Sequence, residues 1–251
     1  MSAASIGGAS AAASARAFAG FPPEMIRFFR SLKRNNRREW FQPRKHVFDE
    51  QVKAPMLELI AAVNDELRKF APEYVTEPKK ALFRIYRDTR FSADKTPYKT
   101  HIAASFARRG GERLGTGGFY FSVSHDMIEV AAGLWHPDRD VTLAVRNHIA
   151  ETHEELREIL ADKKSRKLAG ELRGDSLSRT PKGFEATHPA AQFLKMKDWV
   201  LDVTLDPALA TTPQLHPAIV ERFRAMAPVV GYLNRPLLAR KPARDLFEER
   251  W

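Results

Sequence analysis

The sequence predicts an α+β fold in which a mainly antiparallel sheet is flanked by helices within a single domain. Apolar residues recur with helical spacing before residue 70 and after residue 138, whereas the runs between them have the alternating pattern of strands. The links at 88–100 and 107–118 are too short and irregular for the crossover helices that parallel strands require. Strands grouped between helical segments are typical of the α+β class.

The helical segment at the start of the domain follows a tail rich in Ala, Ser and Gly. We expect residues 1–20 to be disordered and order to begin at Phe21. A first helix should end at Asn35–Asn36. A second helical stripe covers 47–70, and Pro55 should bend or divide it because proline removes a backbone donor.

Four strands are expected in the middle of the chain. They cover residues 81–87, 101–106, 119–125 and 128–135. The last two are joined by His125–Asp126–Met127, which indicates a tight hairpin. These strands account for the central sheet.

The second half of the chain is expected to return to helices. Asp138 or Asp140 should cap a helix, and Thr152–His153 should split it. A further strand is expected at 199–205 and a final helix at 217–238, so that the domain covers 21–238 and is followed by a C-terminal tail over 239–251.

Composition excludes several kinds of site. The chain has no cysteine, which rules out disulfides, thiolate metal sites and thiol nucleophiles and fits a reducing, cytoplasmic location. No apolar run approaches the roughly 18 residues of a membrane span. The histidines have no metal-binding spacing, no motif specifies a cofactor, and we predict no metal site. The net charge of +10 favours anionic partners.

The charge is most concentrated in RIYRDTRFSADKTPYK, residues 84–99. If 82–88 is a strand, Phe83, Ile85 and Arg87 share one face, and the apolar pair draws Arg87 inward. A buried guanidinium is costly unless it is satisfied. Asp88, Asp94 or Glu129 would satisfy it from within the fold, and a bound anion would do so from outside.

Two interpretations of this basic stretch remain open. In the first, its cations converge on an anion, because arginine and lysine suit phosphate and carboxylate oxygens. Tyr98 would then form a wall of the site and Asp88 would orient the arginines. In the second, the same charges form a salt-bridge network that pins a long loop to the sheet. The candidate anion-binding residues are Arg84, Arg87, Arg90, Lys95 and Lys99.

Acid–base candidates are fewer. Asp94, His101 and His136 are the first choices for catalysis. Asp138 would orient His136, or it would cap the following helix and leave His136 on the surface. Glu129 is either an acid partner or an ordinary exposed residue.

Four separated motifs occur in an order that resembles a known family. They are FPPEMIRFFRSLKRNNRREWF, RIYRDTRFSADKTPYKTHI, GGFYFSVSHDMIEVAAGLWHPD and SLSRTPKGFEATHPAAQFLKMKDW. Together they resemble domain of unknown function 2461 over about residues 21–238. The resemblance implies one domain and brings no activity, substrate or catalytic assignment with it.

We therefore expect a protein that binds an anionic small ligand, phosphorylated ligands included, and the sequence does not decide whether it is an enzyme. One alternative is a nucleic-acid-binding module that uses the same basic face; the aromatic and basic residues of 179–199 have a similar pattern. The other is a structural or partner-binding protein in which the Arg/Asp cluster is a folding network.

Overall fold

A five-stranded antiparallel sheet forms the centre of the fold in the computed structural model of the chain, which describes residues 18–109 and 115–238. The strands are β1 (His101–Phe106), β2 (Gly118–Ser124), β3 (Ile128–Leu134), β4 (Leu172–Arg173) and β5 (Trp199–Leu205). Their order is β1-β2-β3-β5-β4, and every neighbouring pair is antiparallel. This arrangement confirms the α+β class with an antiparallel sheet.

Short and long helices precede the sheet in the chain. They are α1 (Pro23–Arg34), α2 (Arg38–Phe41), η1 (Gln42–Arg44), α3 (Lys45–Phe48), η2 (Asp49–Lys53), α4 (Ala54–Phe70), η3 (Pro72–Tyr74) and α5 (Pro78–Ala81). Pro55 lies in the first turn of α4, where a missing N–H costs nothing. The proline therefore divides the helical stripe, as predicted.

The remaining helices follow β3. They are α6 (Arg139–Ala161), α7 (Lys163–Ala169), α8 (Ala191–Leu194), η4 (Pro207–Thr211) and α9 (Leu215–Leu238). The side chain of Asp138 caps α6 by accepting a hydrogen bond from Val141 N at 2.7 Å. Thr152 has non-helical dihedral angles within α6, so the predicted break occurs as a kink.

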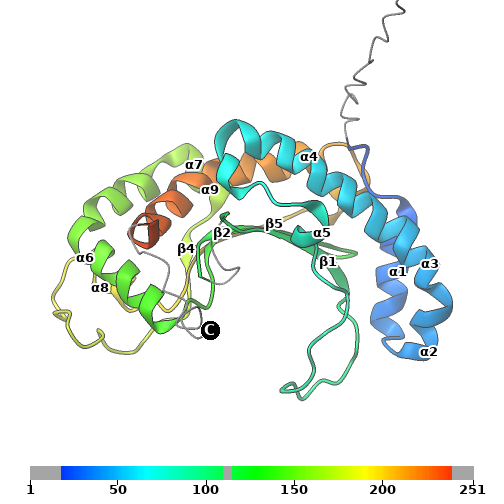
Figure 1. The fold of residues 1–251 in the computed structure, drawn as a ribbon, viewed down its shortest axis with the longest axis horizontal. Coiled ribbons are helices and arrows are strands. Elements are labelled where there is room, and N and C mark those ends of the chain that lie inside the picture. Colours follow the sequence, from blue (N-terminus) through cyan, green and yellow to red (C-terminus); the bar gives the residue numbers. More distant parts are fainter. Residues whose placement is uncertain (1–17, 110–114, 239–251) are drawn as a thin grey trace, which may run out of the picture.

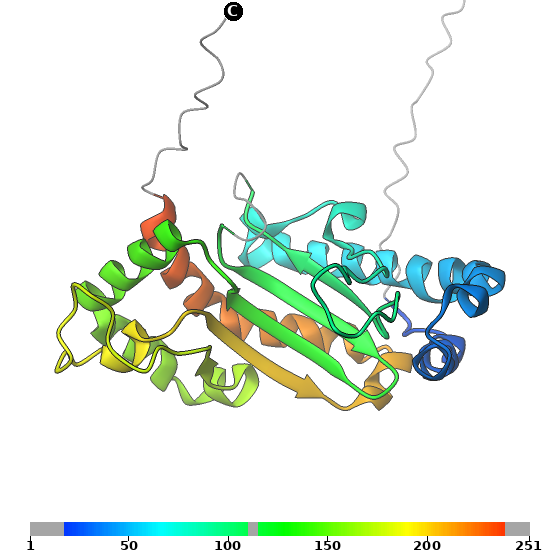
Figure 2. The ribbon, with the colours of Figure 1, turned by 90° about the horizontal axis from the view of Figure 1, so that it is seen from below.

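One face of the sheet carries the core, and α4 and α9 lie over it (Figure 1). Phe223 of α9 packs against Phe106, Phe119 and Phe121, with ring centroids 4.8 to 6.4 Å apart. Side chains alternate along each strand, so the intervening residues point to the opposite face. Figure 2 looks onto that face, and no described helix covers it. We call it the open face.

The expected strand at 81–87 is wrong. Pro78 begins the helical turn α5, after which Leu82 bridges Ala104 and Tyr86 bridges Tyr98. The chain leaves the sheet edge after Phe83, which donates its N–H to Ala103 O, and then pairs within its own loop. Residues 82–99 thus form an irregular hairpin beside β1, which we call the basic hairpin.

Residues 18–20, which were expected to be disordered, are packed against the rest of the fold. Phe18 is buried and its ring packs edge-on against Phe21 at 5.4 Å, while Gly20 has a φ of +106° and lies against the backbone of Thr211. Residues 18–20 therefore belong to the folded domain, because an aromatic side chain anchors them. The rest of the expected tail, 1–17, and the expected tail 239–251 lie outside the described residues. None of the described helices is long and apolar enough to cross a bilayer.

Candidate functional site on the open sheet face

The basic hairpin holds most of its own charges in internal contacts. Arg87 donates to the carboxylate of Asp94 and to Thr96. Arg90 makes a forked pair with Asp88, with Nε–Oδ1 at 3.0 Å and Nη2–Oδ2 at 2.7 Å. The ammonium of Lys95 donates to Thr89 O at 2.9 Å. Of the three carboxylates proposed for Arg87, Asp94 is the one that pairs with it.

These contacts change the acidity of both aspartates. Hydrogen bonds from Arg90 lower the pKa of Asp88 to about 2. Hydrogen bonds from the backbone of Thr96 and then from Arg87 lower the pKa of Asp94 to about 2. Both groups are thus carboxylates at neutral pH and act as ionic partners within the hairpin. This geometry supports a structural role for Arg87 and Arg90.

Two other predicted residues of the hairpin lie apart from these pairs. Tyr98 is only 1% exposed and stacks on Phe41 with ring centroids 4.1 Å apart, so it belongs to the core. Arg84 is exposed on the first arm of the hairpin, near enough to Asp88 to lower its pKa slightly. Of the five candidate cations, Arg87, Arg90 and Lys95 are thus engaged within the hairpin itself.

Lys99 and His101 lie together where the basic hairpin meets β1. The Lys99 ammonium is 4.9 Å from the centroid of the Phe83 ring, and that ring packs edge-on against Tyr120 at 6.0 Å. Burial, and then the charge of Lys99, lower the pKa of His101, so its imidazole is neutral at neutral pH. By strand alternation His101 and Tyr120 both face the open side of the sheet.

An acidic group lies farther along the same face. Glu129 on β3 is directly opposite Ser122 on β2, and Ser122 Oγ is 3.5 Å from Glu129 Oε2. Asp202 on β5 is opposite Ala131, two residues from Glu129, which makes the two carboxylates diagonal neighbours on one face. Burial, and then the charge of Asp202, raise the pKa of Glu129.

Tyr120 completes the arrangement. Its pKa is raised by burial, while a hydrogen bond with Ser122 lowers it and the charge of Glu129 raises it. We call these residues the open-face cluster: Lys99, His101, Tyr120, Ser122, Glu129 and Asp202. The strand positions between them carry small residues, Ala103, Ser105, Ala131 and Gly133. Polar groups with perturbed pKa values over a floor of small side chains are typical of a binding or catalytic site.

The three candidate catalytic residues are not brought together. Asp94 is engaged in the basic hairpin, and His101 lies at the start of β1, level with Ser124. His136 follows the far end of β3, on the order of 25 Å away at about 3.3 Å per strand residue. The three therefore do not form one acid–base centre.

His136 has a different partner from the one considered. Its backbone N–H donates to Asp198 Oδ1 at 2.7 Å, and its Nδ1 is 3.4 Å from the same oxygen. Asp198 is buried, whereas the His136 side chain is exposed and its φ is +45°. Asp138 is instead occupied as the cap of α6, in line with the interpretation that leaves His136 on the surface.

Sequence reasoning missed Tyr120, Ser122 and Asp202. A signal for Asp202 was present, because WVLDVTL places one carboxylate in an otherwise apolar strand. Glu129 in IEVAAGL is the matching case on β3. The pairing of β3 with β5, which joins these two positions, is not visible in the sequence.

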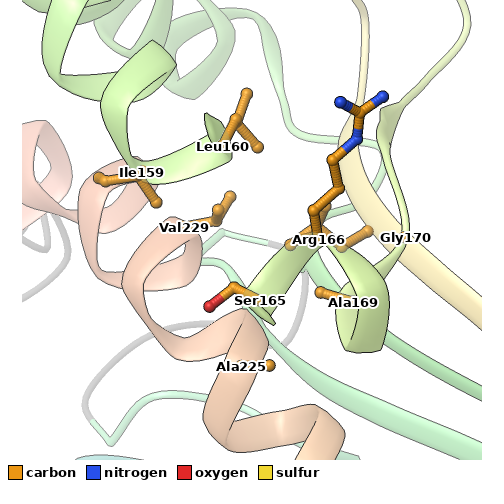
Figure 3. Close-up of a pocket in the computed structure, with 9 residues that line it drawn as sticks. Ile159, Leu160, Ser165, Arg166, Ala169, Gly170, Ala225 and Val229 are labelled. Carbon is orange, nitrogen blue, oxygen red and sulfur yellow. The ribbon is translucent and has the colours of Figure 1, made fainter. Parts of the chain in front are cut away.

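Two hollows in the surface lie away from the open-face cluster. The first is a gap of about 10 Å³ between α6, α7 and α9. Ile159, Leu160, Ala169 and Val229 are among the residues that line it (Figure 3). It has room for one water molecule. A shallow groove of about 460 Å³ lies beside it, between α6, α7, β4 and α8. Within 18–109 and 115–238, no three His, Asp or Glu side chains are placed to hold a metal ion.

The comparison with known proteins gives the family. The sequence matches the family model described as "Conserved hypothetical protein (DUF2461)" over residues 24–232. The chain belongs to this family. The DUF2461 match runs from α1 into α9 and includes the basic hairpin and the open-face cluster. No curated protein and no solved structure matches the chain.

Proposed function

We propose that the open face binds a small anionic ligand that also carries hydroxyl groups, such as a sugar phosphate. One observation carries the proposal: a cation, Lys99, and a carboxylate pair, Glu129 and Asp202, lie on the same helix-free sheet face with Tyr120 and Ser122 between them. The anionic group of the ligand would lie at the Lys99 end. Its hydroxyl groups would donate to the two carboxylates.

The dimensions of the sheet suit a ligand of this size. Neighbouring strands are about 4.8 Å apart, so β1 and β3 are separated by roughly 10 Å and β5 lies one strand farther. A lysine ammonium attracts phosphate as a point charge, and carboxylates accept hydrogen bonds from hydroxyl groups. The rings of Phe83 and Tyr120 offer apolar surface between the two charged ends. Arg84 and Lys95 would strengthen the positive field without touching the ligand, whereas Asp94 and Asp88 neutralise Arg87 and Arg90.

The same geometry supports a place for acid–base chemistry. Glu129 has a raised pKa because burial and Asp202 disfavour its charge, which brings its proton exchange closer to neutral pH. His101 is neutral at neutral pH and able both to donate and to accept a hydrogen bond. We assign proton transfer to Glu129 and ligand orientation to His101. A cytoplasmic location fits this proposal, since the chain has no cysteine.

The test is a comparison of three probes by isothermal titration calorimetry: glucose 6-phosphate, glucose and inorganic phosphate. We expect the sugar phosphate to bind more tightly than either fragment, because only it reaches both ends of the cluster. Lys99→Met should weaken binding of the sugar phosphate more than binding of glucose. Asp202→Asn should weaken binding of both compounds that carry hydroxyl groups, glucose 6-phosphate and glucose.

Lys95→Met is the matched control, since Lys95 is in the same hairpin but donates to Thr89 O. Its affinity should stay within about two-fold of the wild type. Binding of the sugar phosphate that survives both Lys99→Met and Asp202→Asn would contradict the proposed site. If none of a broad set of sugar phosphates gives a heat of binding, the proposed ligand class would be contradicted.

A further inference from the structure

The tip of the basic hairpin exposes an aromatic ring. Phe91 is 95% exposed, the most exposed of the large apolar side chains in the described part of the chain. The guanidinium of Arg90 lies 5.7 Å from its ring centroid. An exposed aromatic residue with a stacked arginine suits recognition of another planar group.

The ring is presented by a braced loop. Asp94 accepts hydrogen bonds from Thr96 N at 2.9 Å and from Arg87, and Ser92 N donates to Thr89 O at 3.4 Å. These contacts lie on both sides of the tip. These ionic and hydrogen-bonding contacts fix the loop that carries Phe91. The ring itself lies in solvent and does not pack in the core.

The basic hairpin is also fastened to the first helices. Tyr98 stacks on Phe41 of α2, and Asn36, between α1 and α2, hydrogen-bonds the backbone of Tyr98. Tyr86, on the other arm, is 6.5 Å from Phe41 between ring centroids and is partly exposed. Figure 1 shows the hairpin and α2 reaching beyond the sheet on the same side. The base of the hairpin and the α1–α2 junction are thus in direct contact at one end of the molecule.

This end of the molecule is strongly basic. Two of the cations of α1 are paired, Arg27 with Glu24 and Lys33 with Asp126. Other exposed arginines of α1, α2 and their junction have no carboxylate partner among the described residues. They are Arg30, Arg34, Arg37 and Arg38. Arg84 and Lys95 add two cations on the basic hairpin itself.

We propose that this surface, the hairpin tip and the α1–α2 arginines, binds single-stranded nucleic acid. A base would stack on Phe91 beside Arg90, and the phosphates would follow the arginines of α1 and α2. A duplex offers no free base face to Phe91. An anionic membrane matches the charge, but the tip has one apolar ring flanked by Asp88, Ser92 and Asp94, which disfavours insertion into lipid. This surface uses residues outside the open-face cluster and is independent of the ligand proposed there.

Fluorescence anisotropy with a labelled oligothymidylate of about 15 nucleotides tests the proposal, since this length fits the site sizes of single-strand-binding proteins. The full chain is titrated at salt concentrations from about 50 to 200 mM, and log affinity should fall linearly with log salt. Phe91→Ala should weaken binding roughly ten-fold, the loss expected for one stacked base, whereas Phe91→Trp should retain it. Arg37→Gln combined with Arg38→Gln should lower the salt slope by about one unit for each lost contact.

Leu143→Ala is the matched control, because Leu143 is an exposed apolar residue of α6, away from this end. It should leave the affinity unchanged. Equal affinity for a duplex of the same length, or Phe91→Ala binding as tightly as the wild type, would overturn the proposal. So would binding to phosphatidylserine vesicles without binding to the oligonucleotide. Calorimetry of Phe91→Ala with glucose 6-phosphate separates the two proposals, since its affinity for that probe should not change.

Discussion

Asn36 and Tyr98 exchange two hydrogen bonds across 62 positions of sequence: Asn36 Nδ2 donates to Tyr98 O at 2.8 Å, and Tyr98 N donates to Asn36 Oδ1 at 3.0 Å. The amide side chain satisfies the backbone of a buried residue as a neighbouring strand would. It is a polar link between the α1–α2 junction and the basic hairpin. We therefore expect this link to help hold the hairpin in position.

Asn36→Ala should lower the free energy of unfolding by about 2–4 kcal/mol, because it leaves both backbone groups of a buried residue unsatisfied. Urea denaturation followed by tryptophan fluorescence measures this change. Asn35→Ala is the control, since the side chain of Asn35 makes a local bond to Ser31 O. Equal losses in the two variants would show that the link to Tyr98 contributes nothing beyond a helix-end contact.

Asn234 of α9 is a second buried amide with tertiary partners. It accepts from Gly117 N at 2.7 Å and donates to Gly117 O at 2.9 Å and to the hydroxyl of Tyr74 at 2.7 Å. We expect Asn234→Ala to cost about 3–5 kcal/mol and to lower Tm by roughly 6–15 °C in a thermal melt. Arg235→Ala, next along the helix, loses an exposed pair with Glu155 and should cost about 1 kcal/mol or less.

Gly133 of β3 has no space for a side chain. Its φ is +137°, and a Cβ atom there would lie 2.1 Å from the carbonyl oxygen of Trp199 on β5. Gly133→Ala should therefore force β3 and β5 apart and destabilise the protein by on the order of 3 kcal/mol or more, measured by urea denaturation. Gly231→Ala in α9 meets nothing within 4 Å and should stabilise by about 0.5–1 kcal/mol.

Glu129 makes a signed prediction about pH. Its pKa is above the ordinary value in the folded state, so between these two values the native protein keeps a proton that the unfolded chain has released. The free energy of unfolding therefore falls as pH rises through this window. Glu129→Gln removes this fall in the free energy of unfolding, because glutamine does not ionise. The variant should therefore become more stable relative to the wild type as the pH rises above 4.5.

A series of urea denaturation curves across this pH range measures the difference. Glu171→Gln is the control of opposite sign, because hydrogen bonding to Arg166 lowers the pKa of Glu171. The ionised Glu171 stabilises the folded state fully at pH values above its unfolded pKa. This stabilisation is lost as the pH falls through the pKa of Glu171 in the folded state. A difference between wild type and Glu129→Gln that does not vary with pH would contradict the assigned burial of the carboxyl group.

Local signals in the sequence predicted local structure well. The cap at Asp138, the break at Thr152, the division at Pro55 and the hairpin at His125–Asp126–Met127 all depend on a few neighbouring residues, and the structure has each of them. The strand expected at 81–87 failed because alternation of Phe83 and Ile85 with polar residues does not supply a partner strand. In the fold that segment pairs mainly with its own loop.

The candidate site was predicted only in part for a related reason. Lys99 and His101 are only two positions apart in the chain, and sequence reasoning found both. Glu129 and Asp202 are brought together by the pairing of β3 with β5, which joins segments separated by three helices and the strand β4. The pairing of Arg87 with Asp94 was one of the expected alternatives, because seven residues of a tight loop keep these charges close.

The strand order has a consequence for synthesis of the chain. β1, β2 and β3 follow one another closely, but β5, which completes the hydrogen bonding of β3, is made only after α6 and α7. While the nascent chain grows on the ribosome, β3 is therefore an unpaired sheet edge, and unpaired edges join readily with other chains. α9, which covers the apolar face of the same sheet, is made later still. We therefore expect the first half of this protein to be prone to aggregation until β5 and α9 have been synthesised and have packed against the sheet.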